Sequence, residues 1–116
     1  MPDQFNVSKT ESAGGTVLLR VNGQLDSKSA PQLVSQCGTV RSAGKNLVLN
    51  LSGVSFIASS GVGALLALVE QFREHGKSVR FVLLSPAVES VIRLLNLDQF
   101  LTIDRTEADA VSALET

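Results

Sequence analysis

The chain of 116 residues has no tryptophan and no tyrosine, and it contains only one cysteine and one histidine. A single cysteine excludes a disulfide bond within the chain, and Cys37 shares a helical apolar pattern with Leu33, Val34 and Val40, which predicts a buried thiol. One histidine and one cysteine are too few for a conventional zinc site, and the acidic residues do not have the spacing of a calcium loop. We therefore expect no metal and no other cofactor.

An excess of one charge sign is also lacking, because ten basic and eleven acidic residues leave a net charge of −1 and are scattered along the chain. With no basic face and few aromatic side chains for base stacking, direct nucleic-acid binding is not expected. No apolar run approaches the roughly 20 residues that cross a bilayer. The first ten residues do not have a basic segment followed by an apolar one. We expect a cytoplasmic protein without direct membrane insertion, which leaves recruitment through a partner open.

Strand and helix patterns alternate along the chain. Residues 5–10 and 16–22 predict an opening hairpin. Helical patterns run from about 27–30 to Gly44, from 60 to 75 and from Pro86 onward. Gly76 is expected to end the second helix, Ser85 to be the N-cap of the third, and Thr106 to be the N-cap of a last helix. Strands are predicted at 46–51, 78–84 and 102–103. The length suits one domain, residues 1–116 with a core of about 5–113. We predict an α/β fold whose mixed sheet of about five strands, parallel after the hairpin, packs with about four helices.

The most informative segment is residues 46–66, NLVLNLSGVSFIASSGVGALL. Its apolar run at 47–51 predicts a strand that is covered on both faces and that ends at the small and polar residues Ser52, Gly53 and Ser55, and helical spacing begins at Val62. Ser59 or Ser60 is then expected at the N-cap, ahead of backbone N–H groups that have no partner inside the helix. These donors and the positive end of the helix dipole favour an anion, so the turn suits either a plain cap or a reversible phosphoserine.

The sequence gives little support for an enzymatic role of this segment. A serine hydrolase is the most specific enzymatic alternative, because Ser59 lies at a strand-to-helix turn, but the nucleophile motif Gly-x-Ser-x-Gly is missing. His75 lies sixteen positions further along the same predicted helix, about 24 Å away, and suits the helix C-terminus instead. Gly61 and Gly63 are not followed by the Gly-Lys-Ser/Thr of a phosphate-binding loop, so they serve either close approach of a partner or tight packing. We expect a protein that is not an enzyme.

Several segments together resemble STAS domains, the family named for sulfate transporters and anti-sigma factor antagonists. The tetrapeptide Ala58-Ser59-Ser60-Gly61 resembles the family's Asp-Ser-Ser-Gly motif between a strand and a helix. Other segments also resemble the family, in the same order, over about residues 5–113. They are Gly23-Gln24-Leu25-Asp26 with Ala30-Pro31, Phe56-Ile57 before the motif, Val62-Gly63 after it, Val82 to Leu84 with Ser85-Pro86-Ala87-Val88, and Leu94-Leu95-Asn96-Leu97.

The resemblance implies a bacterial anti-sigma factor antagonist, which binds an anti-sigma factor when unphosphorylated and so regulates sigma-factor-dependent transcription. In such systems the anti-sigma factor is commonly also the serine kinase and supplies the ATP, and a serine phosphatase resets the cycle. Ser59 takes the place of the phosphorylated serine, with Ser60 as the second choice. A homodimer is left open. The implied partner-binding residues are Asp26, Ala58, Ser59, Ser60, Gly61, Val62 and Gly63.

The motif departs from the family at Ala58, where most phosphorylated members have aspartate. Because that carboxylate would help to present the serine hydroxyl to a kinase, its absence favours an alternative. Some STAS domains bind without phosphorylation, as scaffolds in signalling assemblies or as accessory subunits of membrane lipid-transport systems. The sequence leaves both readings open.

Overall fold

The computed structural model describes residues 4–116. Five strands form one sheet in the order β1-β2-β3-β4-β5, in which β1 and β2 are antiparallel and all later pairs are parallel. This mixed α/β fold confirms the predicted class. The elements are β1 (Asn6–Glu11), β2 (Val17–Leu25), α1 (Ala30–Ser42), β3 (Leu47–Ile57), α2 (Ser59–Glu74), β4 (Val79–Val82), α3 (Pro86–Leu94), the 3₁₀ turn η1 (Leu97–Gln99), β5 (Ile103–Asp104) and α4 (Glu107–Glu115).

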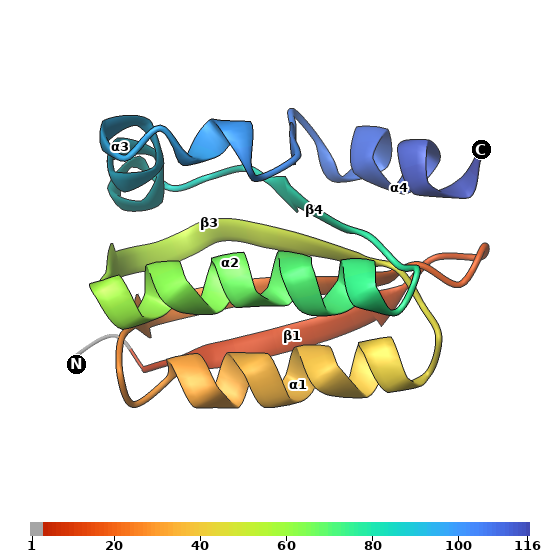
Figure 1. Cartoon of the computed structure of the whole chain (residues 1–116), viewed down its shortest axis with the longest axis horizontal. Coiled ribbons are helices and arrows are strands. Elements are labelled where there is room, and N and C mark those ends of the chain that lie inside the picture. Colours follow the sequence, from red (N-terminus) through yellow and green to blue (C-terminus); the bar gives the residue numbers. More distant parts are fainter. Residues whose placement is uncertain (1–3) are drawn as a thin grey trace.

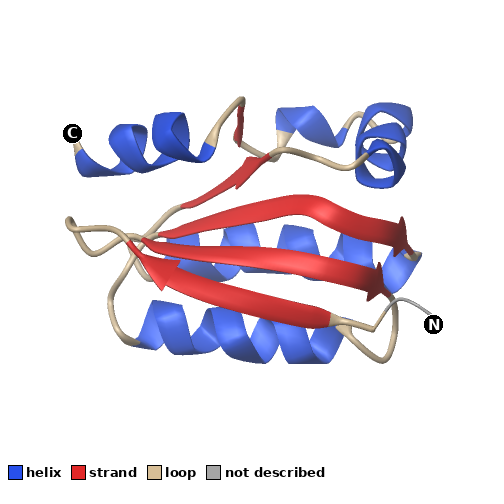
Figure 2. Cartoon of the chain, turned by 180° about the vertical axis from the view of Figure 1, so that it is seen from behind, coloured by secondary structure: helices blue, strands red, loops and turns tan. Residues whose placement is uncertain are grey.

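The two faces of the sheet are covered unequally. Helices α1 and α2 lie side by side over one face (Figure 1). Seen from behind, β1, β2 and β3 lie in front with no helix of residues 4–116 across them, and α4 lies beyond them on the side of β4 (Figure 2). The main core lies between the sheet and α1, α2 and α3, while a smaller one joins Leu18, Val48 and Val82 to Ala110 of α4. Residues 47–51 are therefore buried, as their apolar run predicts.

The predicted helix ends at three places are confirmed. The Ser85 hydroxyl accepts a hydrogen bond from the Val88 N–H at 3.2 Å, and the Thr106 hydroxyl accepts one from the Asp109 N–H at 3.0 Å. Gly76 follows α2 with a φ of 69°, a left-handed conformation that favours glycine. These signals are read correctly from sequence because each joins residues only a few positions apart.

Strand β3 is longer than the sequence predicts. Ser52, Gly53 and Ser55 are expected to end it, but the strand continues to Ile57. Its register with β2 shifts twice along this stretch, which marks irregularities of the β-bulge kind. The bulges absorb the small and polar residues without ending the pairing, so the strand reaches the start of α2 directly.

Two predicted apolar positions turn out to be exposed. Strand β4 ends at Val82, and Leu83, expected inside this strand, has a left-handed backbone with a φ of 54° and a side chain that is 44% exposed. The helical spacing of Val88, Val91, Ile92 and Leu95 predicts one apolar stripe. Helix α3 ends at Leu94, however, so Leu95 lies outside the stripe. Its side chain is half exposed because it lies past the last helical turn.

Cys37 is buried in α1, as predicted. Burial raises the pKa of its thiol to about 12, so the thiol stays protonated at neutral pH. Among residues 4–116, no helix has the length and apolar character needed to cross a membrane.

Candidate functional site

The ends of the parallel strands β2 and β3 bring two distant segments together. Leu25 at the end of β2 is in register with Ile57 at the end of β3. The Leu25 carbonyl accepts a hydrogen bond from the Ala58 N–H at 2.9 Å. Since Asp26 follows Leu25 directly, it lies at the same end of the sheet as the first turn of α2. Figure 1 shows the loop between β2 and α1 at the end of the molecule where α2 begins. The predicted partner-binding residues, Asp26 and residues 58–63, therefore share one end of the sheet, and their role in binding stays a prediction.

The prediction that Ser59 or Ser60 is the N-cap of this helix is wrong. Ala58 is the N-cap, with extended backbone angles, and the serines are the first two helical residues. The N–H groups of Gly61 and Val62 both donate to the Ala58 carbonyl, at 2.9 and 3.1 Å. The shift arises because β3 continues to Ile57 and the chain turns at once. Alanine has no side-chain acceptor, so no side chain caps α2.

Both serines lie on the surface of the domain. Ser59, Ser60 and Gly63 are exposed, and Ala58 and Val62 are half-buried. In a helix the first N–H groups have no intrahelical partner, and the dipole makes this end positive. An anion attached to Ser59 would therefore meet a favourable local field and would need no rearrangement of the buried core.

The two glycines of the first turns have different roles. A Cβ on Gly61 would lie 2.7 Å from the Leu25 carbonyl oxygen and 2.9 Å from side-chain atoms of Leu25 and Ile57. Gly61 therefore permits α2 to approach the end of β2 closely. A Cβ on Gly63 would meet nothing within 4 Å. Of the two uses predicted for these glycines, tight packing applies to Gly61, and only Gly63 leaves open surface.

Asp26 shapes the loop that borders the site. Its Oδ1 accepts hydrogen bonds from the N–H groups of Lys28 and Ser29, at 3.0 and 3.1 Å, and from the Ser29 hydroxyl at 3.2 Å. These bonds, the one from the Ser29 N–H first, lower the pKa of the Asp26 carboxyl, so it stays charged at neutral pH. The loop between β2 and α1 is thereby held in place beside the start of α2.

Sequence reasoning missed an aromatic side chain close to the site. Phe56 lies two positions before Ala58 and opposite Gln24 of β2, and its side chain is 50% exposed. An exposed phenylalanine three positions before Ser59 offers apolar contact area to a partner. The strand pattern could not reveal it, because the second register shift falls at Ser55 and changes the side on which Phe56 is presented.

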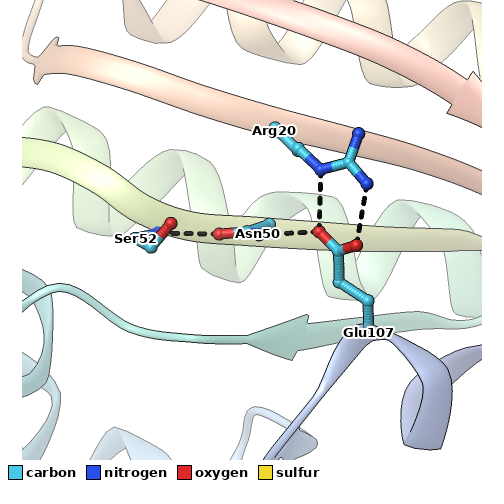
Figure 3. Close-up of polar contacts among 4 residues, drawn as sticks. All are labelled: Arg20, Asn50, Ser52 and Glu107. Atoms are coloured by element: carbon cyan, nitrogen blue, oxygen red, sulfur yellow. Dashed lines mark hydrogen bonds and ion pairs between the residues drawn. The ribbon is translucent and has the colours of Figure 1, made fainter.

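A polar network on the open sheet face was also missed. Nε and Nη2 of Arg20 donate to Glu107 at 2.9 and 2.8 Å, and Nδ2 of Asn50 donates to the same carboxylate at 2.7 Å (Figure 3). The Asn50 side-chain oxygen accepts the Ser52 N–H at 2.9 Å. The hydrogen bond from Arg20 is the main cause that lowers the pKa of Glu107. The network connects α4 with β2 and β3, and the one visible signal in sequence is an asparagine inside an apolar run.

The placement of His75 argues against hydrolase chemistry at Ser59. Ser59 is the first residue of α2, and His75 follows its last residue, with Nδ1 2.9 Å from the Gln71 carbonyl oxygen. The histidine therefore cannot serve as a base for that hydroxyl. Within residues 4–116, no group of three or more histidine, cysteine, aspartate or glutamate side chains is placed to hold a metal ion.

Comparison with known proteins identifies relatives over nearly the whole chain. The anti-sigma-F factor antagonist RsfA of Mycobacterium tuberculosis is 28% identical over 100 residues, which cover 84% of this chain and 78% of that protein. An anti-sigma factor antagonist from Mycobacterium paratuberculosis has a similar crystal structure, with a TM-score of 0.85, 27% identity, and coverage of 97% of this chain and 96% of that one.

A second similar structure is that of the Bacillus cell fate determinant SpoIIAA in its phosphorylated form. Its TM-score is 0.71 at 23% identity, over 93% of this chain and 98% of that one, which shows the shared fold. The family model described as STAS domain matches residues 7–110. The fold and the sequence match therefore agree, and the chain belongs to the STAS domain family.

Proposed function

We propose that this protein is an anti-sigma factor antagonist that is switched by phosphorylation of Ser59. The unmodified protein binds an anti-sigma factor that is also a serine kinase, and this binding frees a sigma factor for transcription. The kinase supplies the ATP, so the antagonist needs no cofactor of its own. A serine phosphatase removes the phosphate and restores binding. The protein itself catalyses no reaction, and the cycle operates in the cytoplasm.

The observation that carries this proposal is the exposed Ser59 side chain at the first position of α2. The hydroxyl lies at the end of the sheet that also carries Asp26, so a partner can contact both segments together. The names of the relatives support the partner class: RsfA is an anti-sigma-F factor antagonist, and SpoIIAA has been solved in a phosphorylated form. Ser60, the second choice for the phosphate, is exposed as well.

Phosphorylation can end binding without unfolding the domain. A phosphate adds about −1.5 to −2 charges and three acceptor oxygens. The positive N-terminal end of α2 accommodates this charge, so the free protein loses little stability. A partner surface fitted to a neutral hydroxyl must instead accept a bulky, strongly hydrated anion, and desolvating that anion in the interface is unfavourable. The switch therefore acts on the complex rather than on the fold.

Ala58 favours a second candidate function, that of a STAS module which binds constitutively. The N-cap of α2 has no side-chain acceptor, and no carboxylate stands immediately before Ser59 to orient the hydroxyl for a kinase. Such a module would serve as a scaffold in a signalling assembly or as an accessory subunit of a membrane lipid-transport system. It would use the same surface at Asp26 and residues 58–63.

The two candidates are separated by phosphopeptide mass spectrometry of the protein purified from its own cells under several growth conditions, together with its bound partners. Matched strains carry Ser59→Ala or Ser60→Ala. The switch predicts phosphate at residue 59, its loss in Ser59→Ala but not in Ser60→Ala, and an ATP-binding serine kinase that copurifies only with the unmodified form. An unphosphorylated protein in every condition, with a stable scaffold or transport complex attached, would establish the second candidate.

A further inference from the structure

A hollow of about 290 Å³ lies along α2, away from the Ser59 end. The hollow is lined by Leu66 and Val69, which are both partly buried. It is also bordered by Phe100, the residue after η1, whose side chain is 64% exposed. Glu70 and Arg73 complete the lining. Apolar lining with an exposed aromatic side chain and a charged border is the usual composition of a protein interface.

The hollow occupies the flank of α2 that does not face α1. The α1 side of α2 is identified by the hydrogen bond from Arg41 to Gln71, at 2.8 Å. Leu66, Val69 and Arg73 recur at spacings of three and four, which places them along one line of the helix. Arg73 donates to Glu70 at 2.7 Å, and both side chains are more than half exposed, with 73% and 54% of their surface open. An exposed pair of this kind contributes little to the stability of one chain, so Glu70 and Arg73 can each pair with a charged group of another chain instead.

We propose that this flank of α2 binds a second copy of the chain around a two-fold axis. In such a contact the two α2 helices run antiparallel, and Phe100 of each copy enters the hollow of the other. Glu70 of one copy then faces Arg73 of the second copy, and the reciprocal pair forms on the other side of the axis. A two-fold contact requires a surface that is complementary to itself. One acid and one base beside an apolar centre meet that requirement, whereas a partner of one charge sign would be repelled by one of them.

The proposed contact is separate from the switch. Leu66 lies seven positions after Ser59, or about 10 Å along the helix axis. Variants of Glu70, Arg73 and Phe100 therefore leave Ser59 and that end of the sheet unchanged. The dimer can fail while the proposed function holds, and the reverse is equally true.

The test is sedimentation velocity of the full chain over a concentration series, with Glu70→Arg, Arg73→Glu and the double variant Glu70→Arg/Arg73→Glu. Each single reversal creates two like-charge contacts and should raise the dimer dissociation constant about tenfold or more. The double variant should restore dimerisation, because both pairs are rebuilt with exchanged signs. An equimolar mixture of the two single variants should form a heterodimer, while each variant alone dissociates. Phe100→Ser should weaken the wild-type dimer without lowering the melting temperature, since the side chain is exposed.

A wild-type chain that stays monomeric up to its solubility limit would overturn the proposal. Failure of the double variant to regain the wild-type affinity would also overturn it, because the charge pairing would then be wrong. If the wild type is monomeric and Phe100→Ser instead loses binding of the copurifying anti-sigma partner, the hollow belongs to that partner. Ser59→Asp serves as the matched control, since the dimer should tolerate it.

Discussion

Glu107, at the start of α4, accepts two hydrogen bonds from Arg20 of β2, at 2.9 and 2.8 Å, although the two residues are 87 positions apart in the chain. Asn50 of β3 donates to the same carboxylate at 2.7 Å. One side chain thus connects the last helix with two central strands on the otherwise open face of the sheet (Figures 2 and 3). Bidentate geometry makes this ion pair stronger than an ordinary surface pair, although 40% of the Arg20 side chain is exposed.

We expect Glu107→Gln to lower the free energy of unfolding by about 1 kcal/mol, because one charge-assisted contact is lost while the shape is kept. Asp109→Asn is the matched control. Asp109 lies in the same first turn of α4, and its cap contact uses the backbone N–H rather than the carboxylate. Urea unfolding measures the free energy of unfolding of both variants. Equal losses would mean that Glu107 contributes only through its charge at the helix N-terminus and not through the contact with Arg20.

The same contact has a defined pH dependence. The pKa of Glu107 is lowered from its ordinary value of 4.5, first by the hydrogen bond from Arg20. The unfolded chain therefore takes up this proton at a higher pH than the folded chain does, and the stabilisation is complete above that ordinary value. As the pH falls below 4.5 and through the lowered pKa, the difference in melting temperature between wild type and Glu107→Gln should shrink. A difference that stays constant down to pH 3 would contradict the ion pair.

Gly61→Ala and Gly63→Ala should have opposite effects on stability. At Gly61 the added methyl meets the Leu25 carbonyl oxygen, and we expect a loss of about 1 to 3 kcal/mol from overpacking. At Gly63 the methyl enters open space inside a helix, and a gain of about 0.5 to 1 kcal/mol follows from the better helix propensity of alanine. Thermal unfolding of the two variants side by side checks the packing of α2 against β2.

Leu65→Ala should destabilise the domain by about 2 to 5 kcal/mol, since a buried leucine is replaced and a cavity remains. Leu65 is only 1% exposed and belongs to the main core. Leu94→Ala provides the control, because that side chain is 80% exposed. Comparable urea midpoints for Leu65→Ala and wild type would show that α2 buries a different face.

Ser59→Asp should weaken binding of the anti-sigma partner at least tenfold while the melting temperature stays within a few degrees of wild type. The carboxylate adds a negative charge at a position where the partner surface is fitted to a neutral hydroxyl, whereas the positive N-terminal end of α2 accommodates this charge. Ser59→Asn has nearly the same shape without the charge and should bind more tightly than Ser59→Asp. Calorimetric titration with the purified partner compares them. Unchanged affinity of Ser59→Asp would remove the basis of the phosphoswitch.

Ala58→Asp should stabilise the domain by about 1 kcal/mol by supplying the missing N-cap acceptor and a negative charge at the positive helix end. Ala58→Asn supplies the acceptor without the charge, so the two variants separate capping from the dipole contribution. Only the aspartate variant should lose part of its gain in high salt. No gain in melting temperature from either variant would place the N-cap elsewhere.

The sequence by itself determined the features that depend on near neighbours. Alternation of strand and helix, the buried run at 47–51, the caps at Ser85 and Thr106 and the position of Ser59 near a helix start can all be read from short windows, because periodicity and capping act within about one turn. The family resemblance implied that Asp26 and residues 58–63 form one binding surface, and the pairing of Leu25 with Ile57 brings these two segments to the same end of the sheet.

Only the tertiary structure decided the details that depend on pairing between distant segments. Register shifts between β2 and β3 carried β3 to Ile57, moved the N-cap to Ala58 and exposed Phe56. The same approach of α2 to Leu25 made Gly61 a packing residue and left Gly63 free. Arg20 and Glu107 meet because parallel pairing brings β2 and β3 side by side and α4 packs against β3. None of these contacts has a local signature, because each depends on which side chains the folded sheet and helices bring together.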